Sequence, residues 1–124
     1  MKSAYISIAM SKKNLLFICS QNWHRSKTAE TIFSENKDIN VKSAGTNTYA
    51  ENPLSNQLLE WADAVFVMEH HHKESILKRF DSSTIEEKQI SVLDIPDRYR
   101  YMDPALIEIL KEKVKANLSM TDFP

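Results

Sequence analysis

The sequence predicts an α/β fold, a three-layer sandwich in which helices cover both faces of a parallel sheet. Short apolar runs alternate with segments of helical periodicity along most of the 124 residues. This alternation is typical of βαβ units, in which each helix leads back to the start of the next parallel strand. The composition, 42% hydrophobic and 27% charged, is that of a globular chain with one core. We expect a single domain over residues 13–124, preceded by an extension at residues 1–12.

The first half of the chain predicts two strands and two helices. Asn14–Ile18 is a short, largely apolar run, which favours a strand buried on both faces. A helix with one apolar stripe is expected from about Arg25 to Asn36. Ile39–Ser43 is short and rich in β-branched residues, and it predicts the second strand. Pro53 suits the start of the next helix because its missing N–H is not needed there.

The second half predicts two more strands. A helix follows the third strand directly, and a loop connects the fourth strand to the last helix. Ala64–Met68 is the strongest apolar run and is expected to be the third strand. Glu69–Phe80 has helical periodicity, and Gln89–Leu93 is the expected fourth strand. Asp103-Pro104 is typical of an N-cap and a first helical residue, and the helix that it opens is expected to end near Asn117.

The charge balance and the cysteine content exclude several classes of protein. The formal net charge is −1, with no basic excess, so nucleic acid is not an expected partner. No apolar run is long enough to span a membrane, and the N-terminal residues are too weakly apolar for a secretory signal. The single cysteine cannot form an intramolecular disulfide. We therefore expect a cytoplasmic protein without membrane or nucleic-acid partners.

The candidate catalytic and phosphate-binding residues lie in the segment Cys19–Ser26. This segment follows the first predicted strand and leads into the first predicted helix. Ligands of such folds bind at the carboxyl ends of the strands, where helix N-termini converge. A helix N-terminus, backbone N–H groups and the nearby Arg25 guanidinium favour a thiolate at Cys19, and the same groups bind a phosphate dianion. The alternative interpretation of Cys19 is a small buried hydrophobic residue. The expected phosphate-binding loop consists of Ser20, Gln21, Asn22, Trp23, His24 and Arg25.

This segment resembles the signature Cys-x5-Arg-Ser/Thr of the low-molecular-weight protein tyrosine phosphatases. Ser43-Ala44-Gly45-Thr46 resembles the second-strand motif of that family, and Asp63–Met68 resembles its third strand. The resemblance covers nearly the whole chain from Lys13. It implies a flavodoxin-like sheet of four parallel strands in the order 2-1-3-4.

The resemblance also implies roles for residues around the loop. Asn22 is expected to hold the loop in a strained backbone conformation, Ser26 to hydrogen-bond the thiolate, and Ser43 to buttress the loop. The sequence departs from the family at Gln21, where glycine is usual, and at Lys27, where proline is frequent. It is also shorter between the second and third strands, so a reduced or rebuilt substrate rim is expected.

A thiolate mechanism needs an acid that protonates the leaving oxygen, and three aspartates compete for this role. Asp103 has an alternative role as a helix N-cap. Asp94 directly follows the fourth predicted strand and is the second choice. Asp97 matches the acid of the family's Pro-Asp-Pro-Tyr loop, with Arg98 in place of the second proline, so the resemblance selects Asp97. A solvated turn residue is the alternative interpretation of Asp97.

Aromatic residues and a histidine triplet flank the expected site. Trp23 and Tyr99 are the expected substrate rim, with Tyr101 as a further candidate, and ordinary packing is the alternative for the tyrosines. His70-His71-His72 raises the question of a metal site. Consecutive helical residues point about 100° apart, so we expect a solvated helix start and no metal.

The resulting hypothesis is a cysteine-dependent phosphatase, a phosphoric monoester hydrolase that acts on phosphotyrosine or a similar aryl or small phosphomonoester. Cys19 attacks phosphorus, Arg25 and loop N–H groups hold the oxygens, and Asp97 protonates the leaving group. Water then hydrolyses the phosphocysteine. The expected partners are a phosphorylated protein or a small phosphomonoester, with phosphate and vanadate as inhibitors, and no cofactor is expected.

Three alternatives remain open at this point. A non-catalytic phosphate- or phosphoprotein-binding module is compatible with Gln21 and the trimmed rim. An arsenate reductase of the thiol-relay type needs two more cysteines, which the chain lacks, so only a version that uses external thiols is possible. Phosphoarginine or a small metabolite phosphate is a substrate variant of the phosphatase hypothesis.

Overall fold

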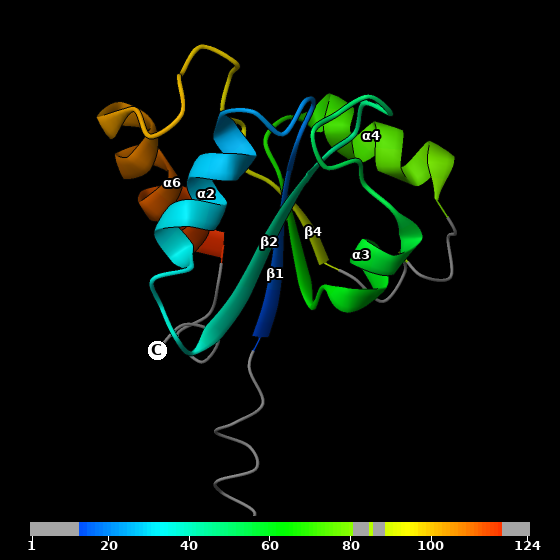
Figure 1. Cartoon of the computed structure of the whole chain (residues 1–124), viewed down its shortest axis with the longest axis horizontal. Helices are drawn as coiled ribbons and strands as arrows, with labels where there is room; N and C mark the ends of the chain where they lie inside the picture. The colour runs from blue at the N-terminus through cyan, green and yellow to red at the C-terminus, as the bar shows by residue number, and fades with distance from the viewer. Residues whose placement is uncertain (1–12, 81–84, 86–88, 118–124) are drawn as a thin grey trace, which may run out of the picture.

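The centre of the molecule is a four-stranded parallel sheet (Figure 1). The computed structural model describes residues 13–80, 85 and 89–117, so the extension expected at residues 1–12 lies outside the described residues. The strands lie in the order β2-β1-β3-β4, and every neighbouring pair is parallel. The predicted fold class and strand order are therefore confirmed. The strands are β1 (Lys13–Cys19), β2 (Ile39–Gly45), β3 (Ala64–Val67) and β4 (Gln89–Val92).

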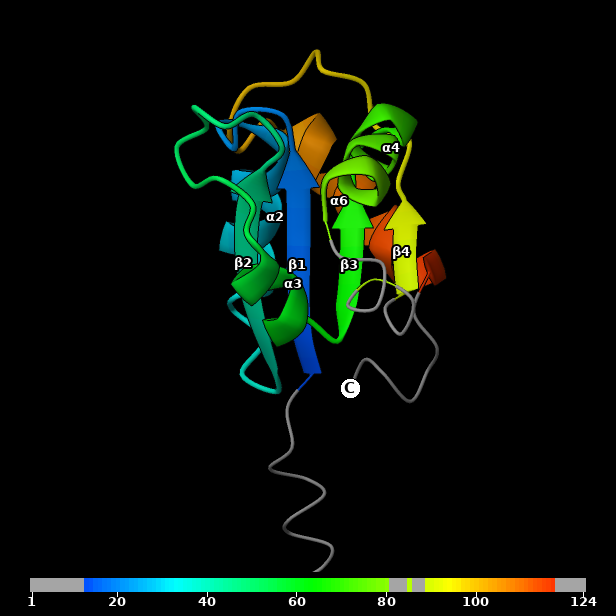
Figure 2. The ribbon, with the colours of Figure 1, turned by 90° about the vertical axis from the view of Figure 1, so that its right-hand side faces the viewer.

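Helices cover both faces of the sheet (Figures 1 and 2). One face carries α2 (Arg25–Phe33) and α6 (Pro104–Asn117), and the other carries α3 (Asn56–Trp61) and α4 (His70–Arg79). Pro104 is the first residue of α6, as predicted. Among the described helices, none has both the length and the apolar character needed to cross a bilayer.

The start of α3 differs from the prediction. Pro53 does not open this helix but forms an isolated bridge with Gly45 at the end of β2. The helix begins three residues later, at Asn56, because Ser55 is its N-cap and the Ser55 hydroxyl accepts a hydrogen bond from the Leu58 N–H at 3.2 Å. The contact with β2 thus overrides the preference of proline for a helix start.

β1 is apolar throughout because its side chains alternate between two hydrophobic cores. Leu15, Phe17 and Cys19 face the core beneath α2 and α6. Leu16 and Ile18 face the core beneath α3 and α4. This double burial explains why the first predicted strand shows no polar alternation. It also places the Cys19 side chain on the same face of the sheet as α2.

The carboxyl ends of the four strands lie at one edge of the sheet, and the loops of chemical interest meet there (Figure 2). β1 ends at Cys19, and Glu69 lies two residues beyond the end of β3. The segment from Leu93 to Asp103 crosses this edge on its way from β4 to α6. Ligands bind at this edge in open parallel sheets.

The single glycine lies where β2 passes directly against the loop that follows β1. A Cβ atom at Gly45 would lie 2.5 Å from the Ser20 carbonyl oxygen and 2.5 Å from the Ala50 Cβ. Gly45 does not have a positive φ. The close approach of two backbone segments, rather than an unusual backbone conformation, therefore requires glycine here.

Gly45→Ala is expected to lower the free energy of unfolding by about 1–3 kcal/mol, because the Ser20 carbonyl is backbone and moves only with the whole loop. Urea denaturation measures the change. Thr48→Ala, an exposed position in the segment after β2, is the matched control and should leave the midpoint unchanged. Equal midpoints for the two variants would show that β2 does not restrain the loop.

Candidate active site

Residues 19–25 form a loop whose first backbone carbonyls point away from its centre. The carbonyl oxygens of Cys19, Ser20 and Gln21 accept hydrogen bonds from N–H groups of the segment 46–51, at 2.9 to 3.1 Å. Within the described part of the chain, the N–H groups of residues 20–24 have no acceptor. Because the carbonyls are held on the outside, these N–H groups are available to an anion inside the loop.

A cavity of about 280 Å³ lies at the centre of this loop. It brings together the cysteine at the end of β1, the arginine at the start of α2 and an aspartate from the segment after β4. Asn22 belongs to the same loop, but its side chain is buried behind the cavity. The lining residues are Cys19, Ser20, Gln21, Trp23, His24, Arg25 and Asp97.

The Cys19 sulfur is linked by hydrogen bonds to Ser26 and, through Ser26, to Asn22. Asn22 has a φ of 61°, so asparagine fills the left-handed position that glycine fills in many tight loops. The Ser26 hydroxyl donates to the Asn22 Oδ1 at 2.6 Å and lies 2.9 Å from the Cys19 Sγ. With its one proton directed to Asn22, Ser26 accepts a hydrogen bond from the Cys19 thiol.

The Asn22 side chain can also serve the ionised form of Cys19. Its Nδ2 is buried and has no partner among the described residues. A 180° rotation of the amide places this N–H on the Ser26 Oγ, which frees the Ser26 proton to donate to a thiolate. In one orientation of the Asn22 amide, Ser26 therefore accepts a hydrogen bond from the Cys19 thiol. In the other orientation, Ser26 donates a hydrogen bond to the Cys19 thiolate.

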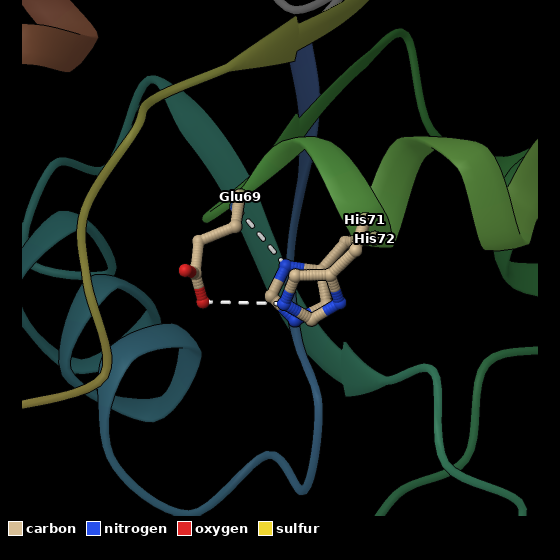
Figure 3. A group of neighbouring side chains, drawn as sticks. All are labelled: Glu69, His71 and His72. Carbon is tan, nitrogen blue, oxygen red and sulfur yellow. Dashed lines mark hydrogen bonds and ion pairs between the residues drawn. The ribbon is translucent and has the colours of Figure 1, made fainter.

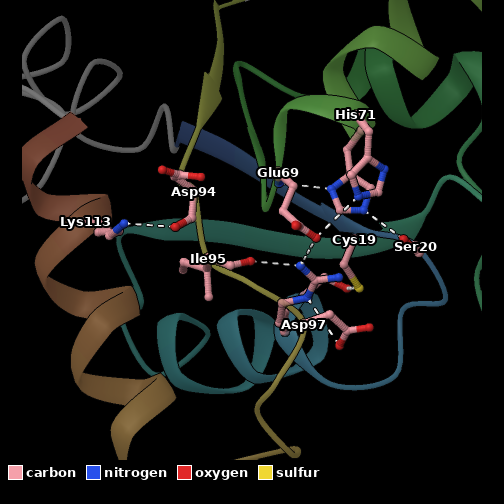
Figure 4. Close-up of polar contacts among 11 residues, drawn as sticks. Cys19, Ser20, Glu69, His71, Asp94, Ile95, Asp97 and Lys113 are labelled. Atoms are coloured by element: carbon pink, nitrogen blue, oxygen red, sulfur yellow. Dashed lines mark hydrogen bonds and ion pairs between the residues drawn. The ribbon is translucent and has the colours of Figure 1, made fainter.

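Arg25 is buried, and its anchoring leaves one edge of the guanidinium without a hydrogen-bond acceptor among the described residues. Its Nη1 donates to the Glu69 Oε1 at 2.6 Å and to the Ile95 carbonyl at 2.8 Å (Figure 4). These two bonds use both Nη1 protons. The Nε and Nη2 groups remain, and such an edge presents two parallel N–H donors, the geometry that suits two oxygens of an anion. Asp97 lies next to this edge, with its Oδ1 3.8 Å from the Nε.

Glu69 is part of the site, although the sequence patterns indicate only the start of a helix at this position. Partial burial raises the pKa of Glu69, but hydrogen bonds and positive charge from Arg25 and His71 outweigh burial and hold the pKa below its ordinary value. Glu69 therefore stays ionised and fixes Arg25. One signal in the sequence was available: a charged residue placed almost directly after the strongest apolar strand, at the edge where ligands bind.

His72 corrects the expectation of a solvated histidine triplet. His70 and His71 are exposed, but His72 is fully buried, because the first turn of α4 lies over the loop. The His72 Nδ1 accepts the Glu69 backbone N–H at 3.0 Å and completes a capping box for α4. Its Nε2 lies 2.9 Å from the Ser20 Oγ. Burial and the nearby charges of His71 and Arg25 lower the pKa of His72 from 6.5 to about 4.

Glu69, His71 and His72 come closer together than helical geometry alone suggests (Figure 3). Their potential ligand atoms lie within 4.8 Å of one another, so two histidines of the triplet approach each other, whereas His70 does not belong to this group. Glu69 precedes the helix as its N-cap, and the two histidine rings lie with their centroids 4.0 Å apart and their planes tilted by 44°. The donor set still does not suit a cation, because the His72 Nδ1 accepts a backbone N–H and the Glu69 Oε1 is paired with Arg25.

The low pKa of His72 predicts a loss of stability in mild acid. Between pH 6.5 and pH 4 the folded protein holds His72 neutral while the unfolded chain binds a proton, so stability falls as the pH falls through this window. The expected contribution is about 3 kcal/mol. Urea denaturation across this range should give a shallower pH dependence for His72→Gln than for His70→Gln. Equal slopes for the two variants would contradict a buried neutral His72.

The two candidate rim tyrosines occupy different places from those expected. Tyr99 does not line the cavity but packs, partly buried, against the core beneath α2 and α6. Tyr101 is half-exposed and lies beside Trp23 in a neighbouring depression, which Lys27 and Glu51 also line. Trp23 is 58% exposed at the junction of the two hollows. Trp23 is therefore the one aromatic residue among those that line the cavity, and Tyr101 lies beside it in the neighbouring depression.

Ser43 supports the loop less directly than the family resemblance implies. Its buried hydroxyl donates to the Glu30 carboxylate in α2, and no described hydrogen bond joins this hydroxyl to residues 19–25. The Asn52 side chain donates to the Ser43 carbonyl at 2.6 Å. Ser43 thus ties β2 to the helix that follows the loop.

The three aspartates that are candidates for the general acid differ in their position relative to the cavity. Asp97 lines the cavity, whereas Asp94 is exposed, has a φ of 58° and does not line the cavity. Figure 4 shows Asp94 beside Lys113, away from Cys19. The Lys113 ammonium donates to the Asp94 carbonyl at 3.1 Å. Asp103 accepts the Ala105 N–H at 2.9 Å, the contact of a helix N-cap.

Comparison with known proteins found proteins similar to this chain in sequence and in fold. No family model matches the chain. The chain is 29% identical to the protein-arginine-phosphatase of Bacillus subtilis (strain 168), and the alignment covers 54% of this chain and 63%, less than two thirds, of that protein.

Two solved structures illustrate the likeness in fold. The low molecular weight protein tyrosine phosphatase from T. tengcongensis has a TM-score of 0.63 and 21% identity, covering 86% of this chain and 100% of that one. A YwlE arginine phosphatase mutant with a phosphorylated active-site serine has a TM-score of 0.64 and 20% identity, covering 87% of this chain and 98% of that one.

Proposed function

We propose that this chain, which has the fold of the low-molecular-weight protein tyrosine phosphatases, is a cysteine-dependent phosphatase. The observation that carries the proposal is the content of one cavity. It holds the single cysteine, the free edge of a buried arginine, and an aspartate whose Oδ1 lies 3.8 Å from that arginine. A nucleophile, a phosphoryl clamp and a proton donor therefore surround one volume.

The proposed reaction has two displacements at phosphorus. The Cys19 thiolate forms an S–P bond while the bond to the leaving group breaks, and Asp97 gives its proton to the leaving atom. Water then attacks the phosphocysteine, Asp97 accepts a proton from that water, and the S–P bond breaks to release phosphate and the thiolate. Arg25 and the loop N–H groups stabilise the charge on the three equatorial oxygens in both steps.

Phosphotyrosine, or a similar aryl phosphate, is the substrate class that the exposed indole of Trp23 at the cavity mouth suits. Phosphoarginine is the second candidate, and the observation that favours it is the likeness to a protein-arginine-phosphatase. In that case the bond that breaks is P–N, and Asp97 protonates a guanidine nitrogen. Both substrates use the same residues, so only a direct comparison of rates separates them.

The test is phosphate release from matched phosphotyrosine and phosphoarginine peptides by the wild type and by Cys19→Ala. We expect turnover by the wild type, competitive inhibition by vanadate, and no turnover by Cys19→Ala. Turnover that survives in Cys19→Ala would refute the mechanism. Tight binding of phosphate without turnover of any monoester or of phosphoarginine would instead identify a phosphate-binding module.

A further inference from the structure

The Ser20 hydroxyl lies between the buried His72 and the cavity. Ser20 lines the cavity with Cys19 and Arg25, and its Oγ lies 2.9 Å from the His72 Nε2. No other hydrogen bond of this hydroxyl occurs within the described residues. Ser20 therefore connects a side chain of α4 to the volume in which the phosphoryl group is expected to bind.

The contacts of His72 determine which of its ring nitrogens carries a proton. A backbone N–H can only donate, so the His72 Nδ1, which accepts the Glu69 N–H at 3.0 Å, must present a lone pair. In a neutral imidazole the proton is then on Nε2. The Nε2–H consequently donates to the Ser20 Oγ, and Ser20 is the acceptor in this pair.

The direction of this bond determines the direction of the Ser20 proton. A hydroxyl that accepts a hydrogen bond from one side turns its own O–H away from that donor. For Ser20 the side away from α4 is the cavity. Were the His72 tautomer reversed, Ser20 would donate to His72 and would present only lone pairs to an anion.

We propose that Ser20 donates a hydrogen bond to a non-bridging oxygen of the bound phosphoryl group and that His72 is the residue that positions it. The inference rests on the proposed phosphatase function and adds a side-chain donor to Arg25 and the loop N–H groups. Ser20 contacts the reacting group, whereas His72 acts through Ser20. Glu69 takes part twice, because its carboxylate holds Arg25 and its N–H fixes the His72 tautomer.

The experiment compares Ser20→Ala, His72→Asn, the double variant and His72→Gln. The Asn side chain places an acceptor where Nδ1 lies but lacks the donor at Nε2, whereas Gln extends an amide N–H to the position of Nε2. His70→Asn, the same substitution at an exposed position of α4, is the matched control. Two quantities are measured for each variant: the dissociation constant of orthovanadate, by calorimetry, and kcat/KM for phenyl phosphate.

We expect Ser20→Ala and His72→Asn each to weaken vanadate binding and to lower kcat/KM about tenfold, as for one hydrogen bond to a charged group. The double variant should lose no more than either single variant, and His72→Gln should retain most of both quantities. Unchanged vanadate affinity in Ser20→Ala would overturn the inference, as would additive losses in the double variant. If the wild type binds vanadate but has no turnover, the binding results still decide the inference, and only the proposed function fails.

The tautomer itself gives a check that needs no variant. In the 15N NMR spectrum of the folded wild type, the His72 ring should show a protonated Nε2 and an unprotonated Nδ1 at neutral pH. A protonated Nδ1 would overturn the inference, because Ser20 would then be the donor in the pair.

Discussion

Arg25→Lys is expected to lower kcat/KM by about 10³-fold, the largest loss from any substitution that conserves charge. In the structure one guanidinium does two things at once. Its Nη1 is held by Glu69 and by the Ile95 carbonyl, while Arg25 also lines the cavity and its Nε lies 3.8 Å from the Oδ1 of Asp97, another lining residue. A lysine has a single nitrogen, so it can either occupy the anchor or approach the phosphoryl oxygens, but it cannot do both.

Steady-state kinetics with an aryl phosphate, together with urea denaturation, checks this prediction. The matched control is Arg98→Lys, which changes an exposed arginine of the segment between β4 and α6 that does not line the cavity. We expect the control to retain wild-type kinetics. A loss of less than about tenfold in a folded Arg25→Lys protein would mean that the guanidinium edge does not hold the phosphoryl group.

Asp97→Asn is expected to lower kcat by about 10²–10³-fold for a phenyl phosphate, because the leaving phenolate then departs without a proton. The loss should be much smaller for a p-nitrophenyl phosphate, whose leaving group is a weak base and needs little protonation. The measurement is the dependence of kcat on the leaving group in wild type and variant. This dependence should become steeper in Asp97→Asn.

Asp94→Asn is the matched control for the acid assignment. It makes the same change three residues earlier, at an exposed side chain that does not line the cavity. We expect wild-type kinetics and an unchanged dependence on the leaving group. If Asp94→Asn loses the rate with phenyl phosphate while Asp97→Asn keeps it, the acid assignment is wrong.

Features that depend on residues close together in the chain were predictable from the sequence alone. The apolar run before Cys19 predicts a buried strand, and the structure shows why, because β1 packs against two cores. The strand, the cysteine and the arginine six residues later are neighbours in the chain, so their arrangement depends on one loop. Asn22 in a left-handed conformation likewise follows from a tight loop without glycine.

Features that depend on contacts between distant segments were not predictable in the same way. Glu69 and His72 are ordinary residues at a helix start until α4 is placed over the loop, where they meet Arg25 and Ser20. The late start of α3 follows from the bridge between Pro53 and Gly45. A local pattern carries no information about these partners.

The position of the rim aromatics was unpredictable for a different reason. The segment from Leu93 to Asp103 has no regular secondary structure, so side-chain direction does not follow a period. Met102 has a φ of 63°, which reverses the local path of the chain just after Tyr101. Tyr99 packs against the core, and Tyr101 reaches the surface beside Trp23.

The central claim is that Cys19 takes up the phosphoryl group, and trapping that group on residue 19 tests it most directly. In Cys19→Ser the hydroxyl can accept the group, and a phosphoserine resists the hydrolysis that releases it from cysteine. Peptide mass spectrometry after incubation with a reactive aryl phosphate or phosphoarginine should find a single phosphoryl group on Ser at position 19 and none in Cys19→Ala. A phosphoryl group on another residue, or none on residue 19 while the wild type turns over, would contradict nucleophilic catalysis by Cys19.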